Sequence, residues 1–242
     1  MHHFYSMIIG TELLNGRRID KHFNFINQEL TQRGLLHVAN FVLNDNPLLI
    51  QNCFNTVLAD PQSVLFCFGG IGATPDDLTR PLASETFTGQ PLQIHKEAQK
   101  LIIEQFGDEA YPHRINMAKL PPQAKLLKNV VNNVPGFQLF DRFFFTPGFP
   151  SMAWPMVKEA LDTFFPDAPK PYTSNFTIET NESELIDIME QLPNELGFSS
   201  LPRFEGDKRF VEIYLSHLNK DFLTKWSTFF QESIQAKGKK IL

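Results

Sequence analysis

Three glycines and two aspartates stand close together between residues 69 and 80, and their types suit a phosphate site. Gly69, Gly70 and Gly72 have no side chain, so their backbone N–H groups can approach an anion directly. Asp76 and Asp77 follow shortly afterwards and offer hard oxygen ligands for a divalent cation. Together these residues predict a phosphate site beside a metal ion. The alternative is a tight turn from strand to helix, in which the acids only favour the helix N-terminus.

The residues on either side of the glycines predict how the loop is held. The apolar run 64–68 is typical of a strand buried on both faces, and Thr79 is expected to cap the helix that follows. The loop matches neither common nucleotide fingerprint. No Gly-Lys-Ser or Gly-Lys-Thr follows it, and Pro75 stands where the dinucleotide fingerprint has its third glycine.

Two further acids stand just past the ends of other expected strands. Glu12 follows a strand over residues 4–9, and Asp45 follows a strand over residues 35–43. Because ligands of open α/β sheets gather at the carboxyl ends of the strands, we expect both acids to face the same crevice as the glycines. For Asp45 the alternative is that its side chain simply caps the next helix.

A Pro/Gly turn follows a fourth expected strand, residues 143–146. Pro147, Gly148 and Ser151 lie between this strand and the helix after it, which exposes backbone N–H groups at the same crevice. The alternative is a helix start that binds no ligand.

The alternation of strands and helices predicts an α/β domain with a mostly parallel sheet over residues 1–168. The first apolar set at helical spacing is Ile19, Phe23, Ile26 and Leu30. Residues 167–171 are expected to form a linker. A small α+β domain over residues 171–242 follows, with strands at 174–179, 198–204 and 209–215 and helices at 182–192 and 222–234.

The composition excludes several classes of protein. The 242 residues are 42% apolar, enough for a sizeable core, and the net charge of −5 argues against a nucleic-acid surface. No run approaches the roughly 20 apolar residues of a membrane span. The two cysteines lack metal or redox spacing, so we expect a cytoplasmic protein. The 24 phenylalanines are expected in cores or in the interface of a homo-oligomer.

The string Gly-Gly-Ile-Gly-Ala-Thr-Pro-Asp-Asp-Leu-Thr-Arg, residues 69–80, closely resembles the signature of the CinA N-terminal domain, part of the molybdopterin-binding (MoCF-like) superfamily. Residues 10–16 and 147–152 resemble two further motifs of that family. The chain departs from them at Thr11, where the family has Asp, and at Met152, where it has Glu. Lys21 and His22 replace a usual Thr-Asn pair. The amidase domain of longer CinA proteins has no counterpart, so we expect that activity to be absent.

The resemblance implies a three-layer α/β/α domain followed by a small ferredoxin-like domain. It also implies metal-dependent hydrolysis of ADP-ribose or a similar nucleotide, with Mg²⁺, Mn²⁺ or Co²⁺ as the divalent metal and a monovalent cation as a second ion to consider. The expected catalytic residues are Asp77 and Asp45, and the expected metal ligands are Asp76, Asp77 and Glu12. The expected phosphate- or nucleotide-binding residues are Gly69, Gly70, Gly72, Ala73, Thr74, Pro147, Gly148 and Ser151.

Two alternatives of other classes stay open. One is a protein that binds molybdopterin or transfers an adenylyl group to it. The other is a non-catalytic nucleotide sensor, which the departures at Thr11 and Met152 favour. In each case the expected ligand is a nucleotide or a pterin.

Overall fold

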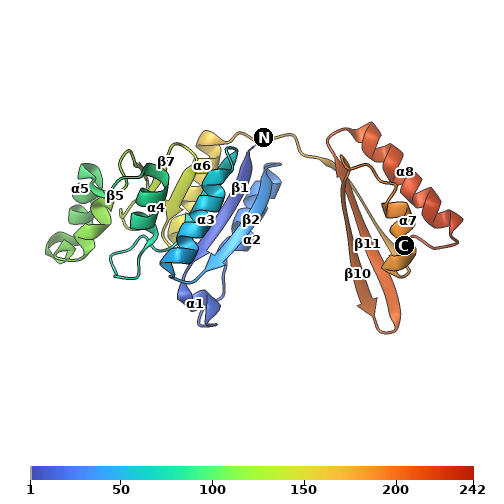
Figure 1. The fold of residues 1–242 in the computed structure, drawn as a ribbon, viewed down its shortest axis with the longest axis horizontal. Helices are drawn as coiled ribbons and strands as arrows, with labels where there is room; N and C mark the ends of the chain where they lie inside the picture. Colours follow the sequence, from blue (N-terminus) through green and yellow to red (C-terminus); the bar gives the residue numbers. More distant parts are fainter. Residues whose placement is uncertain (1) are drawn as a thin grey trace. The chain divides into compact units, whose positions relative to one another are not determined.

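The chain folds as two units, Met1–Ala168 and Pro169–Leu242 (Figure 1). The structure is a computed structural model that describes residues 2–242. Each unit has a hydrophobic core of its own. No helix among residues 2–242 combines the length and the apolar character that crossing a membrane requires.

A six-stranded sheet forms the centre of the first unit. Its strand order is β2-β1-β3-β8-β7-β6, in which the first four strands are parallel and β7 runs antiparallel to both of its neighbours, β8 and β6. The predicted α/β class with a mostly parallel sheet is therefore confirmed. The strands are β1 (His3–Ile9), β2 (Leu36–Leu43), β3 (Ser63–Phe68), β6 (Lys125–Leu127), β7 (Gly136–Leu139) and β8 (Phe143–Thr146).

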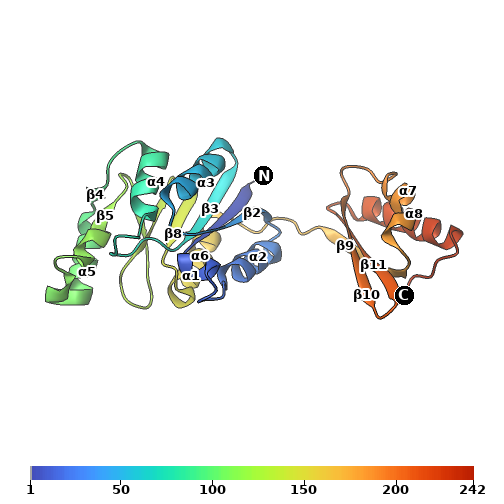
Figure 2. The ribbon, with the colours of Figure 1, turned by 60° about the horizontal axis from the view of Figure 1, so that its bottom comes forward.

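Helices cover both faces of this sheet and make the predicted three layers (Figure 2). α3 (Pro47–Ala59) and α4 (Thr79–Thr88) pack on one face. α2 (His22–Gln32) and α6 (Pro150–Phe164) pack on the other. The remaining elements of the unit are α1 (Thr11–Leu14), β4 (Gln93–Ile94), α5 (Lys96–Phe106), the 3₁₀ helices η1 (Gly107–Ala110) and η2 (Arg114–Ala118), and β5 (Lys119–Leu120).

Stacked phenylalanines fill the space between the layers. All six residues of β3 are buried, as the unbroken apolar run predicts for a strand covered on both faces. The Phe66 ring stacks on Phe144 at a centroid distance of 5.0 Å, and the Phe137 ring stacks on Phe145 at 4.5 Å. Offset stacks of this kind add to the free energy of apolar burial. Much of the unusual phenylalanine content is thus explained by the core.

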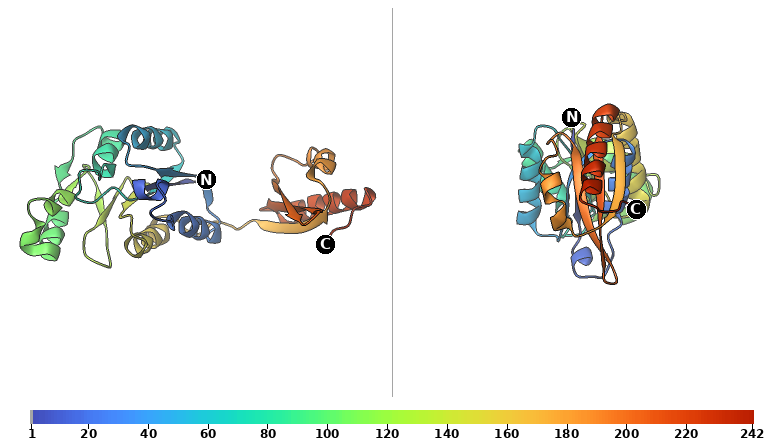
Figure 3. Two further views of the ribbon diagram at one scale, coloured as in Figure 1. Left: turned by 90° about the horizontal axis from the view of Figure 1, so that it is seen from below. Right: turned by 90° about the vertical axis from the view of Figure 1, so that its right-hand side faces the viewer.

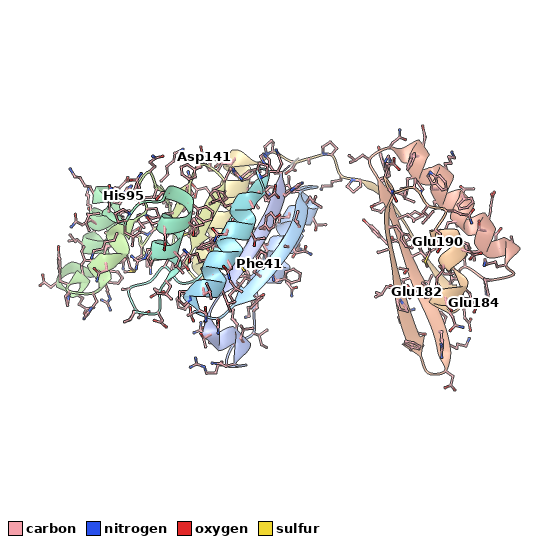
Figure 4. The ribbon with its side chains drawn as sticks, in the orientation of Figure 1. Phe41, His95, Asp141, Glu182, Glu184 and Glu190 are labelled. Carbon is pink, nitrogen blue, oxygen red and sulfur yellow. The ribbon has the colours of Figure 1, made fainter. Side chains whose placement is uncertain are left out.

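The parallel strands end at the same level, which places the loops after them side by side. Phe68 of β3 pairs with Ile8 of β1 and with Thr146 of β8, and Ile8 also pairs with Val42 of β2. The turn between β7 and β8 lies at the opposite edge, where Asp141 is labelled in Figure 4. All of the strand-end loops that the sequence singles out therefore begin at one edge of the sheet.

The second unit is a three-stranded antiparallel sheet with α8 along one face (Figure 3). Its strand order, β10-β11-β9, is that of a ferredoxin-like unit without a full fourth strand. Ile241 makes a single antiparallel bridge to Ile178 of β9 at the place where such a strand would pair. The elements are β9 (Tyr172–Glu179), η3 (Glu182–Glu184), α7 (Ile186–Met189), β10 (Gly197–Glu205), β11 (Lys208–His217) and α8 (Lys220–Ala236).

Three details of the predicted elements are wrong. Ile19 is 87% exposed and outside α2, because Asp20 accepts hydrogen bonds from the N–H groups of His22 and Phe23 and starts the helix there. Thr79 is the first residue of α4 rather than its cap. The helix expected over residues 182–192 is divided into η3 and α7.

Candidate functional site

The glycine loop after β3 depends on backbone angles and clearances that favour glycine. Gly69 and Gly70 have φ values of 96° and 68°, in the left-handed half of conformational space. A Cβ atom at Gly69 would collide with the carbonyl oxygen of Ile9 at the end of β1. A Cβ atom at Gly148 would lie 3.4 Å from the Cα of Gly69. The ends of β1, β3 and β8 therefore meet at these glycines.

Some N–H groups of the glycine loop have partners within the protein, and others do not. The N–H of Gly69 donates to the Thr146 carbonyl at 2.9 Å, and the N–H of Thr74 donates to Asp77 Oδ2 at 2.8 Å. Within residues 2–242, the N–H groups of Gly70, Gly72 and Ala73 have no acceptor. The phosphate-binding N–H groups predicted from the sequence are thus available at three positions, while those of Gly69 and Thr74 are already used.

Two residues of α4, Thr79 and Arg80, hold this loop in place through hydrogen bonds. Thr79 Oγ1 donates to the Gly69 carbonyl at 2.9 Å, and the Thr79 N–H donates to the Gly70 carbonyl at 3.0 Å. The buried guanidinium of Arg80 donates to the carbonyl oxygens of Gly72 and Asn116. Burial lowers the pKa of Arg80, although the nearby charge of Asp77 acts in the opposite sense. In the sequence Arg80 stands out only as the last residue of the motif 69–80, so its role in holding the loop was not predicted.

Asp45 is held by the first loop rather than by the helix that follows it. Its Oδ2 accepts from the Thr11 N–H at 2.9 Å and from the Thr11 hydroxyl at 2.7 Å. Asn46 is the residue that caps α3, through a bond from the Leu49 N–H at 3.1 Å. The capping alternative for Asp45 is therefore wrong, and Asp45 faces the strand-end loops as the site hypothesis requires.

Asp77 is held in the same manner by a threonine. Its Oδ2 accepts from the N–H and from the hydroxyl of Thr74, at 2.8 and 2.5 Å. Asp76 is exposed, and hydrogen bonding with Thr74 and with its own backbone lowers its pKa, so it is ionised at neutral pH. Asp45 and Asp77 each keep Oδ1 without a donor among residues 2–242.

Among residues 2–242, the acids at this edge of the sheet do not form a complete set of metal ligands. Among residues 2–242, no three His, Cys, Asp or Glu side chains group so that they could hold a metal ion. Mg²⁺ bound to a phosphate ligand needs only one or two protein carboxylates, because the phosphates and water supply the rest. Asp76 and Asp77 fit that requirement, and the metal site stays a prediction.

A cleft of about 570 Å³ lies beside the same strand ends, on the α2 side of the sheet. Of the residues predicted for the site, only Glu12 and Gly148 line it. The cationic side chains of Arg17, Arg18 and Lys21 line it as well, and they were missed. Their signal in the sequence is three cations within five residues, in the loop between α1 and α2.

His22 joins this cleft to the Pro/Gly turn. The side chain is buried, stacks on Phe68 at a ring-centroid distance of 4.3 Å, and places Nε2 at 3.2 Å from the Gly148 carbonyl oxygen. Because a carbonyl oxygen only accepts hydrogen bonds, Nε2 carries the proton. Burial lowers the pKa of His22, so the ring is neutral at pH 7 and Nδ1 is unprotonated.

Comparison with known proteins identifies the family. Residues 6–167 match the model of the "probable molybdopterin binding domain" family, which is more than half of the chain. The chain belongs to this MoCF-like family. Its first unit is CinA-like, as the glycine-loop motif predicts.

The relatives of this MoCF-like chain differ in length. A CinA-like protein of Acaryochloris marina is 33% identical over 167 residues, which are 68% of this chain and 38% of that protein. A Thermoplasma acidophilum protein is 27% identical over 222 residues, which are 88% of this chain and 86% of the relative. The chain thus spans about two fifths of the length of the curated CinA-like proteins that it matches.

A solved structure supports the same assignment. The crystal structure of the protein CinA of unknown function from Thermoplasma acidophilum superimposes with a TM-score of 0.61 at 27% identity. The match covers 67% of this chain and 98% of the other. Thr11 and His22 are two positions at which the sequence departs from the motifs that it resembles. Both residues form contacts between strand-end loops, Thr11 with Asp45 and His22 with Gly148.

Proposed function

We propose that the first unit binds a nucleotide diphosphate at the glycine loop and hydrolyses its pyrophosphate bond, with ADP-ribose or a similar nucleotide as substrate. The observation that carries the proposal is the set of free N–H groups at Gly70, Gly72 and Ala73, on a loop that Thr79 and Arg80 hold in place. Consecutive N–H groups at a strand-to-helix turn bind phosphate oxygens well.

The reaction would replace one P–O bond by another. The oxygen of water forms a bond to one phosphorus atom, the bridging P–O bond breaks, and ADP-ribose yields AMP and ribose 5-phosphate. In phosphoryl transfer the protein contributes chiefly position and stabilisation of charge. The loop N–H groups would hold phosphate oxygens, and Asp77, fixed through Oδ2, would offer Oδ1 to the water or to a cation. A divalent cation, when bound, neutralises phosphate charge.

Asp45 has a matching geometry at the next strand end. Its Oδ2 is fixed by Thr11, and its Oδ1 is free to act on the ligand. The N–H of Ser151, which has no acceptor among residues 2–242, lies at the first turn of α6, just beyond the turn that contacts Gly69, and would add a further donor for an anion.

Release of AMP from ADP-ribose tests the proposal. The purified full chain is incubated with Mg²⁺, Mn²⁺ or Co²⁺, and products are separated by chromatography. We expect metal-dependent turnover that falls at least about 100-fold in Asp77→Asn, in line with the loss of a group that stabilises the transition state. The matched control is Asp108→Asn, an exposed acid of η1. Absence of turnover with all three metals would overturn the proposal, as would full activity in Asp77→Asn.

The engagement of Asp45 by Thr11 favours a second candidate, a non-catalytic nucleotide sensor. Thr11, the first residue of α1, donates two hydrogen bonds to Oδ2 of Asp45. This oxygen is therefore less available to a ligand or a metal ion. Tight binding of a nucleotide without turnover would support the sensor. If a pterin displaces the bound nucleotide, the ligand class implied by the family's description is favoured instead.

A further inference from the structure

Three cations on one side of the cleft have no acidic partner. Arg17, Arg18 and Lys21 line the cleft, and among residues 2–242 no carboxylate oxygen lies within 4.0 Å of their charged groups. They are exposed side chains in a chain whose net charge is −5. Unpaired cations gathered in a concave site raise the local concentration of anions.

Two acids also line the cleft, but among residues 2–242 neither forms an ion pair with its three cations. Asp20 accepts from the N–H groups of His22 and Phe23, at 2.7 and 3.1 Å, and so caps α2. Glu12 folds back over Gly10, where its Oε2 would lie 2.8 Å from an added Cβ atom. The positive charge of Arg17, Arg18 and Lys21 is therefore available to a ligand.

The base of the cleft contains a buried polar atom without a partner. His22 is 4% exposed, and its unprotonated Nδ1 has no donor among residues 2–242. Its Nε2 holds the carbonyl of Gly148, the residue whose backbone contacts Gly69. Through Gly148 the cleft adjoins the glycine loop.

We propose that the cleft is a second phosphate subsite, which selects ligands that carry a phosphomonoester in addition to the phosphate on the glycine loop. This inference rests on the proposed nucleotide site. Arginine binds phosphate through two parallel N–H bonds, and a phosphomonoester carries a greater charge than a carboxylate or a phosphodiester. A volume of about 570 Å³ accommodates a phosphorylated sugar, within the usual range of ligand sites.

Calorimetric titration with matched ligands tests the subsite. The full chain is titrated with ADP-ribose, with ADP-ribose 1″-phosphate and with ADP-ribose 2′-phosphate, which place the added phosphate at opposite ends of the molecule. We expect at least one phosphorylated form to bind about 10-fold more tightly than ADP-ribose at low salt, and the difference to shrink as salt screens the charges. The end that carries the effective phosphate is the end that lies in the cleft.

Variants in which arginine is replaced by an uncharged residue test whether the preference for the phosphorylated ligand arises in the cleft. In Arg17→Met with Arg18→Met we expect the advantage of the phosphorylated ligand to fall to about 2-fold or less. The control is Lys96→Met with Lys100→Met, two exposed cations of α5 that give the same change in net charge. Thermal unfolding of both variants verifies that they are folded.

The outcomes separate this inference from the proposed function. Equal affinity for all three ligands overturns the subsite, and so does a preference that the arginine variant keeps. Hydrolysis of ADP-ribose together with equal affinities leaves the proposed function intact. A phosphate preference that depends on Arg17 and Arg18, without any hydrolysis, supports the subsite and contradicts the pyrophosphatase. Absence of binding by every ligand contradicts both.

Discussion

The glycine loop, residues 69–80, and the first loop, residues 10–22, flank the same strand ends but are built in contrasting ways. In the glycine loop, buried side chains of Thr79 and Arg80 donate to backbone carbonyl oxygens and leave N–H groups free. In the first loop, exposed arginine and lysine side chains have no carboxylate partner among residues 2–242, and the contacts of the two arginines are a bond from Arg17 Nε to Asn15 Oδ1 at 3.2 Å and the position of Arg18 over the Phe149 ring.

The glycine loop is therefore suited to rigid recognition of a phosphate, and the first loop to recognition by side chains that adjust to the ligand. A backbone site held by buried hydrogen bonds pays no reorganisation cost when an anion binds, and it accepts any phosphate of the right shape. Long exposed side chains lose rotamer entropy on binding but can adapt to differently placed groups. We therefore expect substitutions in the glycine loop to act on stability and binding together, and substitutions of Arg17, Arg18 and Lys21 to act on ligand choice alone.

The largest effect is expected at Gly70. Gly70→Ala forces a side chain into a left-handed conformation and against Thr79, so we expect a loss of about 2–4 kcal/mol in the free energy of unfolding. Gly89→Ala is the matched control, since Gly89 has a φ of 64° but nothing within 4 Å of an added Cβ. That variant is expected to lose only about 1 kcal/mol. Equal losses in urea unfolding would show that the Thr79 contact does not brace the loop.

A smaller effect is expected from Arg80. Arg80→Met removes the side-chain donor to the Gly72 carbonyl and one of the two donors to the Asn116 carbonyl, which keeps the Lys119 N–H, and should cost about 1–3 kcal/mol of stability. Arg114→Met removes an exposed ion pair with Glu109 and should cost less than about 1 kcal/mol. Because Arg80 holds the loop, ligand affinity should fall as well in Arg80→Met. Unchanged nucleotide binding in a folded Arg80→Met protein would mean that the loop keeps its shape without this side chain.

The fold was predictable because its signals are local and repeated. The apolar run 64–68, the acids after the strands and the alternation of strands with helices all indicate a mostly parallel α/β sheet. The elements that were not predicted correctly are short, or their ends depend on hydrogen bonds that the apolar pattern does not show. β6 has three residues and pairs only at the sheet edge, so its pattern resembles a loop. The start of α2 was misplaced because Ile19 fits the helical spacing, while the Asp20 cap decides where the helix begins.

The geometry of the candidate site was predictable where it rests on the backbone and unpredictable where it rests on packing between distant segments. The glycines themselves indicated free N–H groups, and the structure retains them at Gly70 and Gly72. The bond from Thr11 to Asp45 joins residues 34 positions apart, and that from His22 to Gly148 spans 126 positions. No local pattern contains such pairs, so these two contacts emerge only from the fold.

The smallest predicted effect concerns His22, which joins the first loop to the Pro/Gly turn through Gly148, and it depends on pH. Burial lowers the pKa of His22 below its ordinary value of 6.5, so the unfolded chain binds this proton more readily than the folded chain does. The stability that neutral His22 provides is therefore fully present above about pH 6.5 and is lost as the pH falls below that value.

Wild-type protein should consequently lose more stability between pH 7.5 and 5 than His22→Gln, measured by urea unfolding at each pH. The comparison with a variant is needed because burial also lowers the pKa of His37, which adds a slope of the same sign to both proteins. His113→Gln, a change at an exposed residue, should keep the wild-type slope. If His22→Gln shows that slope too, His22 accepts its second proton without disturbing the bond to Gly148, and the two loops are not coupled through its neutral form.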